Sequence, residues 1–586
     1  MNYLLVILLL LLPCQSLASS FDPHLSDIVE ELLDVEKVPR YWPKANDADW
    51  FAVELDAPTW HQVQGIAHKA GFDVEGRLQS FKNVYIASRK GRRKRSTGAI
   101  IEELISLKEV HWAEQLIPLY REKKSLVFSD PMYEQQMQSW SAPPEMHIAE
   151  AWAEGLSGKG VTLVVVRQYD IFMMMASNRD TKICETPLKQ RFRTASHGTR
   201  CAGIIAMAAN NSKCGVGVAY RSTLGGLTVL AENQFLNDAI EGDALAFKAD
   251  EIDIFSVSWG PKDDGRSAER PGALAQKALE FGALHGRKGL GSLYVWASGN
   301  GGLEDDDCSM DGYASNMHTM TFGVATSSGV PPWYAEGCSA VIASVTTDVG
   351  GECTTFAGSS AAAPLAAGIL ALALEANPAL SQRDIQHLVV HTSNSDHLQS
   401  SSPAYWLTNR AGLHFSRQFG FGVLDAQKLV RFAKTWKSVG PLASCSRQLT
   451  VTNGTFGAES PVQVDLPFEG CANTSGEVNW MERLRLEVTI EHPRRGLISL
   501  FLTSPAGTTI QLLHPRKNDD SADGLSRWPF VSVAQWGENP RGIWRIEVHS
   551  MAHKDVNAVG VLKSAVLTVQ GTRDDPMKEN GFLRPR

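Results

Sequence analysis

The stretch Gly358-Ser359-Ser360-Ala361-Ala362-Ala363-Pro364 runs directly into a series of small and apolar residues, 365–374. This pattern predicts a tight glycine turn followed by a helix, with Ser360 at the start of that helix. Backbone amides and the dipole at a helix N-terminus favour a developing negative charge on nearby atoms. Ser360 is therefore a candidate nucleophile.

Two further motifs contain the partners that a nucleophilic serine needs. His197, in Ser196-His-Gly-Thr-Arg-Cys-Ala-Gly203, is the candidate base, and Asn300, in Ala297-Ser-Gly-Asn-Gly-Gly302, offers an amide to a tetrahedral oxyanion. In this order the three motifs resemble those of subtilisin-type serine proteases, in which the triad runs Asp, His, Ser. The resemblance implies a serine endopeptidase.

The catalytic aspartate is the exception. In the subtilisin-like family it follows the first buried strand in the form Val-x-Asp-Asp-Gly, whereas this chain reads Val166-Arg167-Gln168-Tyr169-Asp170. Arg167 thus stands at the expected aspartate position. Asp170 is the only close substitute, and it lies roughly 10 Å of extended chain beyond the strand end. It would reach the histidine only if the following loop folded back, so we expect it to be a poor replacement.

Two hypotheses follow from Arg167. In the first, the chain is an endopeptidase; in the second, it is a catalytically impaired relative that binds basic peptides without turnover. A cation at this position would repel the imidazolium of the transition state. The departures cluster in residues 167–196, with a further one at Phe356, where the family has a histidine-bearing stretch. Such localised loss fits either a missing exon or a relaxed pseudoprotease.

Composition limits the remaining possibilities. A chain of 586 residues suggests two to four domains, and its net charge of −8 argues against a nucleic-acid binder. The apolar run Leu4–Leu12 before Ser16-Leu17-Ala18 predicts a signal peptide, since it is too short to span a bilayer. We therefore expect a soluble protein of the secretory pathway without a transmembrane segment.

Eight cysteines besides Cys14, and no Cys-x-x-Cys pair, agree with an oxidising compartment and argue against zinc. Acceptor sequences for N-glycosylation at Asn210, Asn453 and Asn473 agree with secretion.

The pattern of apolar residues changes along the chain. From about residue 160, buried-type strands alternate with helices, which predicts a parallel sheet covered on both faces. After about Pro441, short alternating runs rich in β-branched residues predict a β-sandwich.

Other motifs narrow the resemblance to the kexin/furin-like proprotein convertases, over nearly the whole chain. They are Ser256-Val-Ser-Trp-Gly-Pro-Lys-Asp-Asp-Gly265, Trp296-Ala-Ser-Gly-Asn300, Leu374-Glu-Ala-Asn-Pro378 and Trp536-Gly-Glu-Asn-Pro540. The resemblance implies a signal peptide (1–19), an α+β inhibitory prodomain (20–124), an α/β subtilisin-like peptidase domain with a parallel sheet (125–438), an all-β sandwich P domain (439–575) and a tail (576–586). It also implies a monomer of the Golgi or secretory vesicles, or a secreted one, similar to the soluble neuroendocrine members.

Convertases cleave precursors after paired basic residues, and carboxylates receive these residues through charge-assisted hydrogen bonds. By position, Asp263 and Asp311 match the pocket for the residue before the scissile bond. Glu241, Glu269 and Tyr313 match the site for the basic residue four before it. At the second position Gln168 and Thr194 replace the family's acids.

The resemblance also implies calcium, which selects hard oxygen ligands. One site matches Asp263, Asp306 and Glu336, and a second matches Asp130 and the Asn211 side chain. The implied disulfides are Cys214–Cys353, Cys308–Cys338 and Cys445–Cys471, with Cys201 a buried thiol and Cys184 without a family counterpart. The prodomain, itself an expected partner, would be cut between Lys124 and Ser125, and a second time after Arg95.

Overall fold

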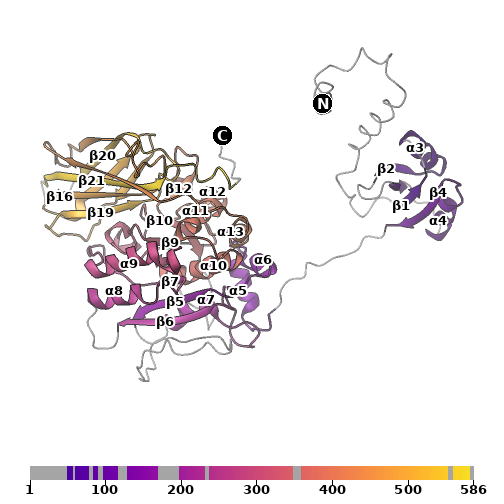
Figure 1. Cartoon of the computed structure of the whole chain (residues 1–586), viewed down its shortest axis with the longest axis horizontal. Coiled ribbons are helices and arrows are strands. Elements are labelled where there is room, and N and C mark those ends of the chain that lie inside the picture. The colour runs from indigo at the N-terminus through magenta and orange to yellow at the C-terminus, as the bar shows by residue number, and fades with distance from the viewer. Residues whose placement is uncertain are drawn as a thin grey trace, which may run out of the picture. The chain divides into compact units, whose positions relative to one another are not determined.

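The computed structural model describes residues 49–56, 60–77, 83–89, 97–116, 128–168, 197–230, 237–347, 358–551 and 558–580. The chain divides into two compact units, Met1–Lys124 and Ser125–Arg586 (Figure 1). The division falls at the junction where prodomain cleavage is expected.

The first unit is an α+β fold with one antiparallel sheet in the strand order β2-β3-β1-β4. Its elements are β1 (Asp49–Leu55), α3 (Trp60–Lys69), β2 (Asp73–Arg77), β3 (Val84–Arg89), α4 (Thr97–Ile105) and β4 (Val110–Gln115). The two helices bury Val63 and Leu104 against Phe51 and Tyr85 of the sheet. The unit therefore has its own hydrophobic core.

The second unit contains a parallel sheet of six strands in the order β10-β9-β8-β7-β5-β6. The strands are β5 (Thr162–Gln168), β6 (Thr223–Leu230), β7 (Ile254–Val257), β8 (Leu293–Ala297), β9 (Thr319–Ala325) and β10 (Val341–Thr346). Strands β7 to β10 are buried throughout, as expected for a parallel sheet covered on both faces.

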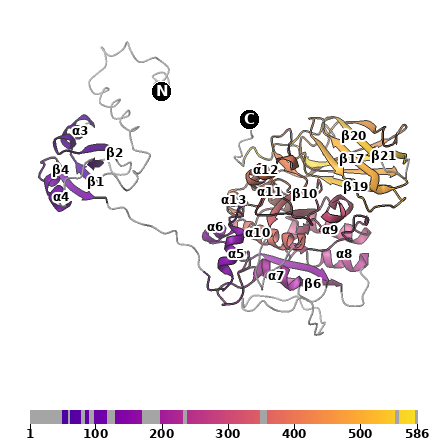
Figure 2. The same ribbon diagram turned by 180° about the vertical axis from the view of Figure 1, so that it is seen from behind.

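Helices cover the two faces of this sheet, and the alternating side chains of β5 mark which helix covers which face. Leu163 and Val165 share a core with α7 (His197–Ala206) and α10 (Ala362–Ala376), whereas Val164 and Val166 pack with α8 (Asp238–Ala246) and α9 (Ala273–His285) (Figures 1 and 2). Further helices are α5 (Tyr133–Trp140), α6 (Ile148–Ala153), α11 (Gln382–Thr392), α12 (Asp396–Ser401) and α13 (Ala426–Ala433). The layers are those of a subtilisin-like fold.

Helix α10 carries the nucleophile region into the centre of this domain. Every residue from Ala362 to Leu374 is buried. Within the described part of the chain, the segment Ser359–Ala376 is also the one helical stretch long and apolar enough to cross a membrane, and most of it is buried inside the protein. Its small side chains thus serve close packing in the core.

The C-terminal part is a sandwich of two antiparallel sheets. One has the order β13-β21-β16-β19 with β14 also paired to β21, and the other has the order β15-β20-β17-β18. The strands are β13 (Ala443–Thr450), β14 (Thr455–Phe456), β15 (Val462–Phe468), β16 (Trp480–Glu491), β17 (Ile498–Thr503), β18 (Thr509–Leu513), β19 (Leu525–Ser532), β20 (Gly542–Ser550) and β21 (Gly560–Thr572). A small hairpin of β11 (Trp406–Thr408) and β12 (His414–Ser416) precedes them.

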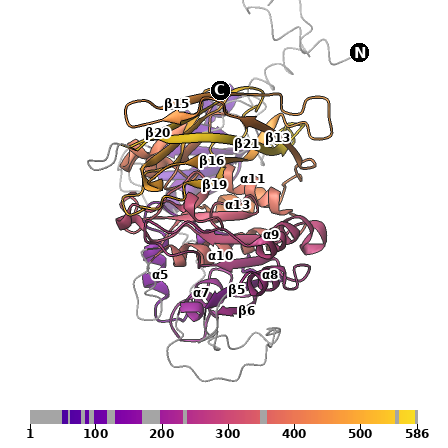
Figure 3. The ribbon, with the colours of Figure 1, turned by 90° about the vertical axis from the view of Figure 1, so that its left-hand side faces the viewer.

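The sandwich lies against the parallel-sheet domain (Figure 3), and buried charged side chains connect the two. Glu482 of β16 accepts hydrogen bonds from Arg383, at 2.5 and 2.8 Å, and from Nε2 of His387 at 3.0 Å, both residues of α11. The neighbouring Arg483 donates to the side chain of Gln386 and to the carbonyl of Thr319. Because this interface shields the charges from water, removing one partner would leave the other charge uncompensated and would destabilise the fold.

Two of the implied disulfides are present, Cys308–Cys338 and Cys445–Cys471. Cys214 is disulfide-bonded as well, but Cys353 and Cys184 lie outside the described residues. Cys201 is buried and is not in a disulfide.

Candidate active site

Ser360 lies in the turn Ser359–Ala361, which leads directly into α10. The turn requires glycine at 358, where φ is +100° and a Cβ atom would lie 3.0 Å from Oδ1 of Asn300. The sequence thus sets both the tight entry to the helix and the half-buried position of the serine. This agrees with the expectation drawn from the glycine-serine pattern.

His197 begins α7, and Cys201 follows it by one helical turn. The sulfur of Cys201 lies 3.5 Å from Nδ1 of His197 and 3.8 Å from the carbonyl oxygen of Ser360. The hydroxyl of Ser258 donates to the same carbonyl at 3.0 Å. One thiol therefore contacts both the ring of His197 and the backbone of Ser360, so the two residues are neighbours in the fold.

Asn300 follows β8 and is oriented by its neighbours. Its Oδ1 accepts a hydrogen bond from the backbone N–H of Ser359 at 2.7 Å, which fixes the direction of the amide. Its Nδ2 donates to Asp263 at 3.3 Å, and its backbone N–H donates to the same carboxylate at 3.0 Å. Because an amide carries two N–H donors, one is left for an oxyanion that forms next to Ser360.

Arg167 lies in β5, and its backbone is in register with Thr228 of β6. The carboxyl end of a parallel strand is where the sites of α/β folds are built. The position of the expected aspartate is therefore preserved in the fold, although its residue is not. Asp170 and Thr194 lie outside the described residues, as do Lys124, Ser125 and Arg95.

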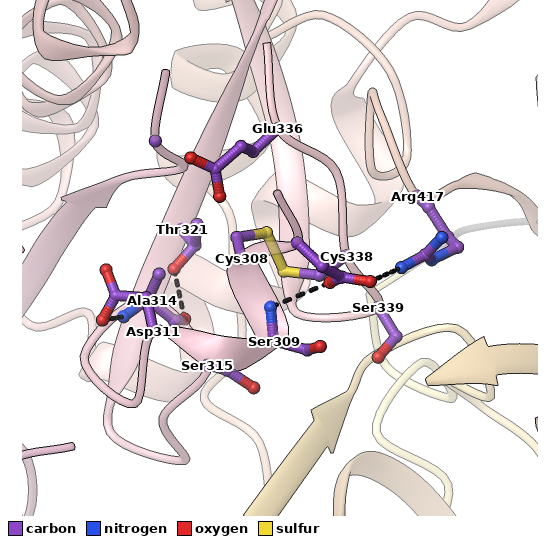
Figure 4. Close-up of a disulfide and its surroundings, with 12 residues drawn as sticks. Cys308, Ser309, Asp311, Ala314, Ser315, Thr321, Glu336, Cys338, Ser339 and Arg417 are labelled. Atoms are coloured by element: carbon purple, nitrogen blue, oxygen red, sulfur yellow. Dashed lines mark hydrogen bonds and ion pairs between the residues drawn. A yellow bond between two sulfur atoms is a disulfide. The ribbon is translucent and has the colours of Figure 1, made fainter. Parts of the chain in front are cut away.

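Four acidic side chains lie close together near Asn300: Glu336 is buried, Asp306 and Asp311 are half-buried, and Asp263 is exposed. Burial raises the pKa of Asp311 to about 7, although N–H groups of Tyr313 and Ala314 donate to its carboxylate. Burial also raises the pKa of Glu336 well above its usual range, reinforced by the charges of Asp306 and Asp263. Figure 4 shows Asp311 and Glu336 beside the Cys308–Cys338 disulfide. Such a region favours a cation.

A second acidic group contains the residues expected to meet the fourth basic residue. The hydroxyl of Tyr313 donates to Oε2 of Glu241 at 2.5 Å. Burial raises the pKa of Glu241, the hydrogen bond from Tyr313 opposes this, and the charges of Asp238 and Glu269 add to it. The backbone of Glu269 pairs with that of Asp311, and Gly312 donates to the Glu269 carbonyl at 2.8 Å. The two acidic groups are thus linked.

The residues expected to bind calcium offer oxygen ligands, as this hard cation prefers. Among the residues that the structure describes, however, no three His, Cys, Asp or Glu side chains converge on one point that could hold a metal ion. Asp306 accepts from the Gly265 backbone at 2.8 Å and from the Arg516 guanidinium at 3.1 Å. The chemistry of this donor set therefore fits calcium, but its carboxylates are not gathered around one point.

At the other expected calcium site, Asp130 is buried and accepts from the backbone N–H groups of Asn210 and Asn211, at 2.6 and 3.1 Å. Oδ1 of Asn211 accepts from the backbone of Lys213 at 2.9 Å. The two residues lie together as expected, with oxygens facing backbone donors.

Sequence reasoning missed the basic residues of the sandwich that reach this region. Arg516 contacts both Asp306 and Asp519, and Arg417 donates to Asp307 at 2.6 Å. Asp306 and Arg516 are 210 residues apart. No local pattern marks such a pair, because it forms only when the two domains pack together.

Comparison with known proteins places these observations in a family. Residues 177–422 match the subtilase family, residues 481–569 the proprotein convertase P-domain and residues 50–124 the peptidase S8 pro-domain. The chain is 40% identical over 520 residues to endoprotease aex-5 of Caenorhabditis elegans, covering 85% of this chain and 92% of that protein. It is 37% identical to furin-1 of Xenopus laevis, covering 88% of this chain and 68% of that protein.

Solved structures support the fold. A serine protease of Aeromonas sobria, in complex with its chaperone, has a TM-score of 0.66 and 21% identity, covering 77% of this chain and 96% of that one. At this identity the similarity concerns the fold alone. The matched domains and the close relatives together show that the chain belongs to the kexin/furin-like proprotein convertase family.

Proposed function

We propose that this chain is a serine endopeptidase that cleaves protein precursors after paired basic residues. The observation that carries the proposal is the sulfur of Cys201, which lies within 3.8 Å of both the His197 ring and the Ser360 carbonyl, next to an Asn300 amide fixed by Ser359. Relatives with the names endoprotease and furin support the same activity. These relatives favour endopeptidase activity over the alternative hypothesis, in which the chain binds basic peptides without turnover.

The roles of the three residues follow from their positions. Ser360 attacks the scissile carbonyl carbon, and His197 takes its hydroxyl proton and later gives it to the leaving amine. The amide of Asn300 donates to the oxygen that becomes negatively charged in the tetrahedral intermediate. Arg167 supplies no negative charge to the imidazolium, so we expect hydrolysis slower than that of a relative with an intact triad.

The acidic groups would select the substrate. Asp263 and Asp311 would receive the basic side chain before the scissile bond, and Glu241, Glu269 and Tyr313 the one four residues earlier. Burial and mutual repulsion raise the pKa of Asp311 and Glu241, and a substrate cation would offset that repulsion. Basic peptides are therefore better suited to this cleft than neutral ones.

Calcium is the proposed cofactor, with Asp263, Asp306 and Glu336 as ligands at one site and Asp130 and Asn211 at another. When bound, the ion would neutralise carboxylates that otherwise repel one another. The raised pKa of Glu336, caused by burial and then by Asp306 and Asp263, supports this assignment. Calorimetric titration with calcium, repeated on a Glu336→Gln variant, tests it; equal heats from both proteins would exclude Glu336 as a ligand.

The chain would act as a zymogen of the secretory pathway, in line with its relatives. Its prodomain would inhibit it until cleavage between Lys124 and Ser125 and after Arg95, and the Golgi and secretory vesicles are the proposed compartments. We also propose a monomer. N-terminal sequencing of the protein released by cells tests the cleavage sites, and light scattering tests the monomer.

Peptide hydrolysis tests the proposal as a whole. The full chain would be incubated with calcium and a fluorogenic Arg-x-Lys-Arg peptide, with Ser360→Ala as the matched control. We expect hydrolysis after the last arginine by the unaltered chain and none by the variant. Equal hydrolysis by both proteins would refute the assignment of Ser360.

A further inference from the structure

Cys201 lies one helical turn after His197 on α7 and is fully buried. Residues four apart on a helix face the same side. The sulfur accordingly lies 3.5 Å from Nδ1 of His197. In a Ser-His-Asp triad the carboxylate contacts this same nitrogen and holds the imidazole in the productive tautomer.

The surroundings of Cys201 offer its single hydrogen acceptors other than the imidazole. Within the described part of the chain, the sulfur lies 3.8 Å from the Ser360 carbonyl oxygen and 4.0 Å from Oγ of Ser258, besides its contact with Nδ1 of His197. An S–H directed to either oxygen leaves a sulfur lone pair facing the imidazole. Nδ1–H can then donate to sulfur, and Nε2 keeps the lone pair that must accept the proton of Ser360.

We propose that Cys201 is the positioning residue that holds His197 in the productive tautomer in this chain, where Arg167 stands in place of the aspartate. The proposal rests on the proposed endopeptidase function. A neutral thiol orients the ring but brings no negative charge to the imidazolium. It therefore accounts for retained but reduced catalysis rather than for full activity.

A purely structural role would give different results. A buried cysteine also behaves as a small apolar side chain that fills space. In that case any loss of volume on α7 would disturb the site, and serine or alanine at 201 would act alike. Ile205 provides the matched control, since it is fully buried on the same helix, one turn further on.

The experiment compares Cys201→Ala, Cys201→Ser and Ile205→Val in the full chain. The tautomer of His197 is read from the ¹⁵N shifts of labelled imidazole, assigned with a His197→Gln variant. We expect the Nδ1–H form in the parent, in Cys201→Ser and in Ile205→Val, and a shift toward the Nε2–H form in Cys201→Ala. Cys201→Val, which fills the space without an acceptor, tests the same point if the alanine variant does not fold.

Kinetics on the Arg-x-Lys-Arg peptide give the second readout. We expect kcat about tenfold lower in Cys201→Ala with KM unchanged, and recovery in Cys201→Ser to within about threefold of the parent. An unchanged tautomer in Cys201→Ala, or an equal loss of kcat in Ile205→Val, would overturn the proposal. If no protein hydrolyses the peptide but the tautomer shifts as expected, the proposed function fails and the role of Cys201 stands.

Discussion

The buried carboxylate of Glu482 offers a test of how the sandwich supports the peptidase domain. Burial alone would raise its pKa, but attraction by His387 and hydrogen bonds from His387 and Arg383 outweigh burial and lower it to about 2 from the ordinary 4.5. Lowering the pKa of this carboxyl from 4.5 to about 2 corresponds to about 3 kcal/mol of stability. Glu482→Gln removes this charge and leaves the half-buried Arg383 without its carboxylate partner, so we expect the free energy of unfolding to fall by about 3 kcal/mol.

The sign of the pH dependence follows from the lowered pKa. The contribution of Glu482 is fully present above pH 4.5 and is lost as the pH falls from 4.5 toward 2, where the folded carboxylate also takes up a proton. The difference between parent and Glu482→Gln should therefore shrink over this range. Both would be measured by urea unfolding in a Ser360→Ala background, which prevents self-cleavage.

Glu487 is the matched control on the same strand, because its partner Arg527 is 77% exposed. An exposed ion pair contributes less than about 1 kcal/mol. Glu487→Gln should thus cost little at any pH. The reasoning is refuted if the two variants lower the free energy of unfolding by the same amount. It is also refuted if the loss caused by Glu482→Gln is the same at pH 6 and at pH 3.

Three further predictions concern the site itself. Arg167→Asp should raise kcat, but the increase should be far smaller than the roughly 3 × 10⁴-fold that the aspartate contributes in subtilisin, because the following residues also depart from the family. Steady-state kinetics that show no increase in kcat would count against Arg167 as the limiting defect. Gly358→Ala should abolish most activity, since a Cβ at φ +100° would lie 3.0 Å from the Asn300 oxygen; a kcat within threefold of the parent would contradict that geometry. Calorimetry on Ser360→Ala protein with calcium should show that an Arg-Ala-Ala-Arg aldehyde binds more tightly than an Ala-Ala-Lys-Arg aldehyde, because its basic side chains meet Glu241 and Asp263. Each charged contact should contribute about 1.5–3 kcal/mol to the binding free energy. Tighter binding of the second peptide, or binding that EDTA does not change, would refute the pocket assignments.

Much of the fold could be predicted from the sequence. The alternation of strands and helices predicted a parallel sheet, and the shift to alternating runs after Pro441 predicted the sandwich. These patterns are local, because each strand or helix carries the apolar period of its own surroundings. The glycine before the nucleophile was equally predictable, because glycine readily adopts the positive φ that the structure shows at this tight turn.

The missed features arise between domains. Arg516 reaches Asp306, and Arg383 reaches Glu482, only through the packing of the sandwich on the parallel-sheet domain. Neither pair has a spacing that a sequence pattern could reveal. The contact between Cys201 and His197 is different: a spacing of four on a helix predicts that the two share a face, and the resemblance implied a buried thiol there, but its distance to Nδ1 required the structure.

The central claim is that Ser360, His197 and Asn300 form one working centre despite Arg167. Its most direct test is the rate at which an irreversible peptidyl phosphonate with a C-terminal arginine labels Ser360, compared among the full chain, His197→Ala and Asn300→Ala. Mass spectrometry would locate the adduct and give the rate. We predict labelling of Ser360 in the full chain and at least a hundredfold slower labelling in both variants. No labelling of Ser360, or equal rates in all three proteins, would contradict the account.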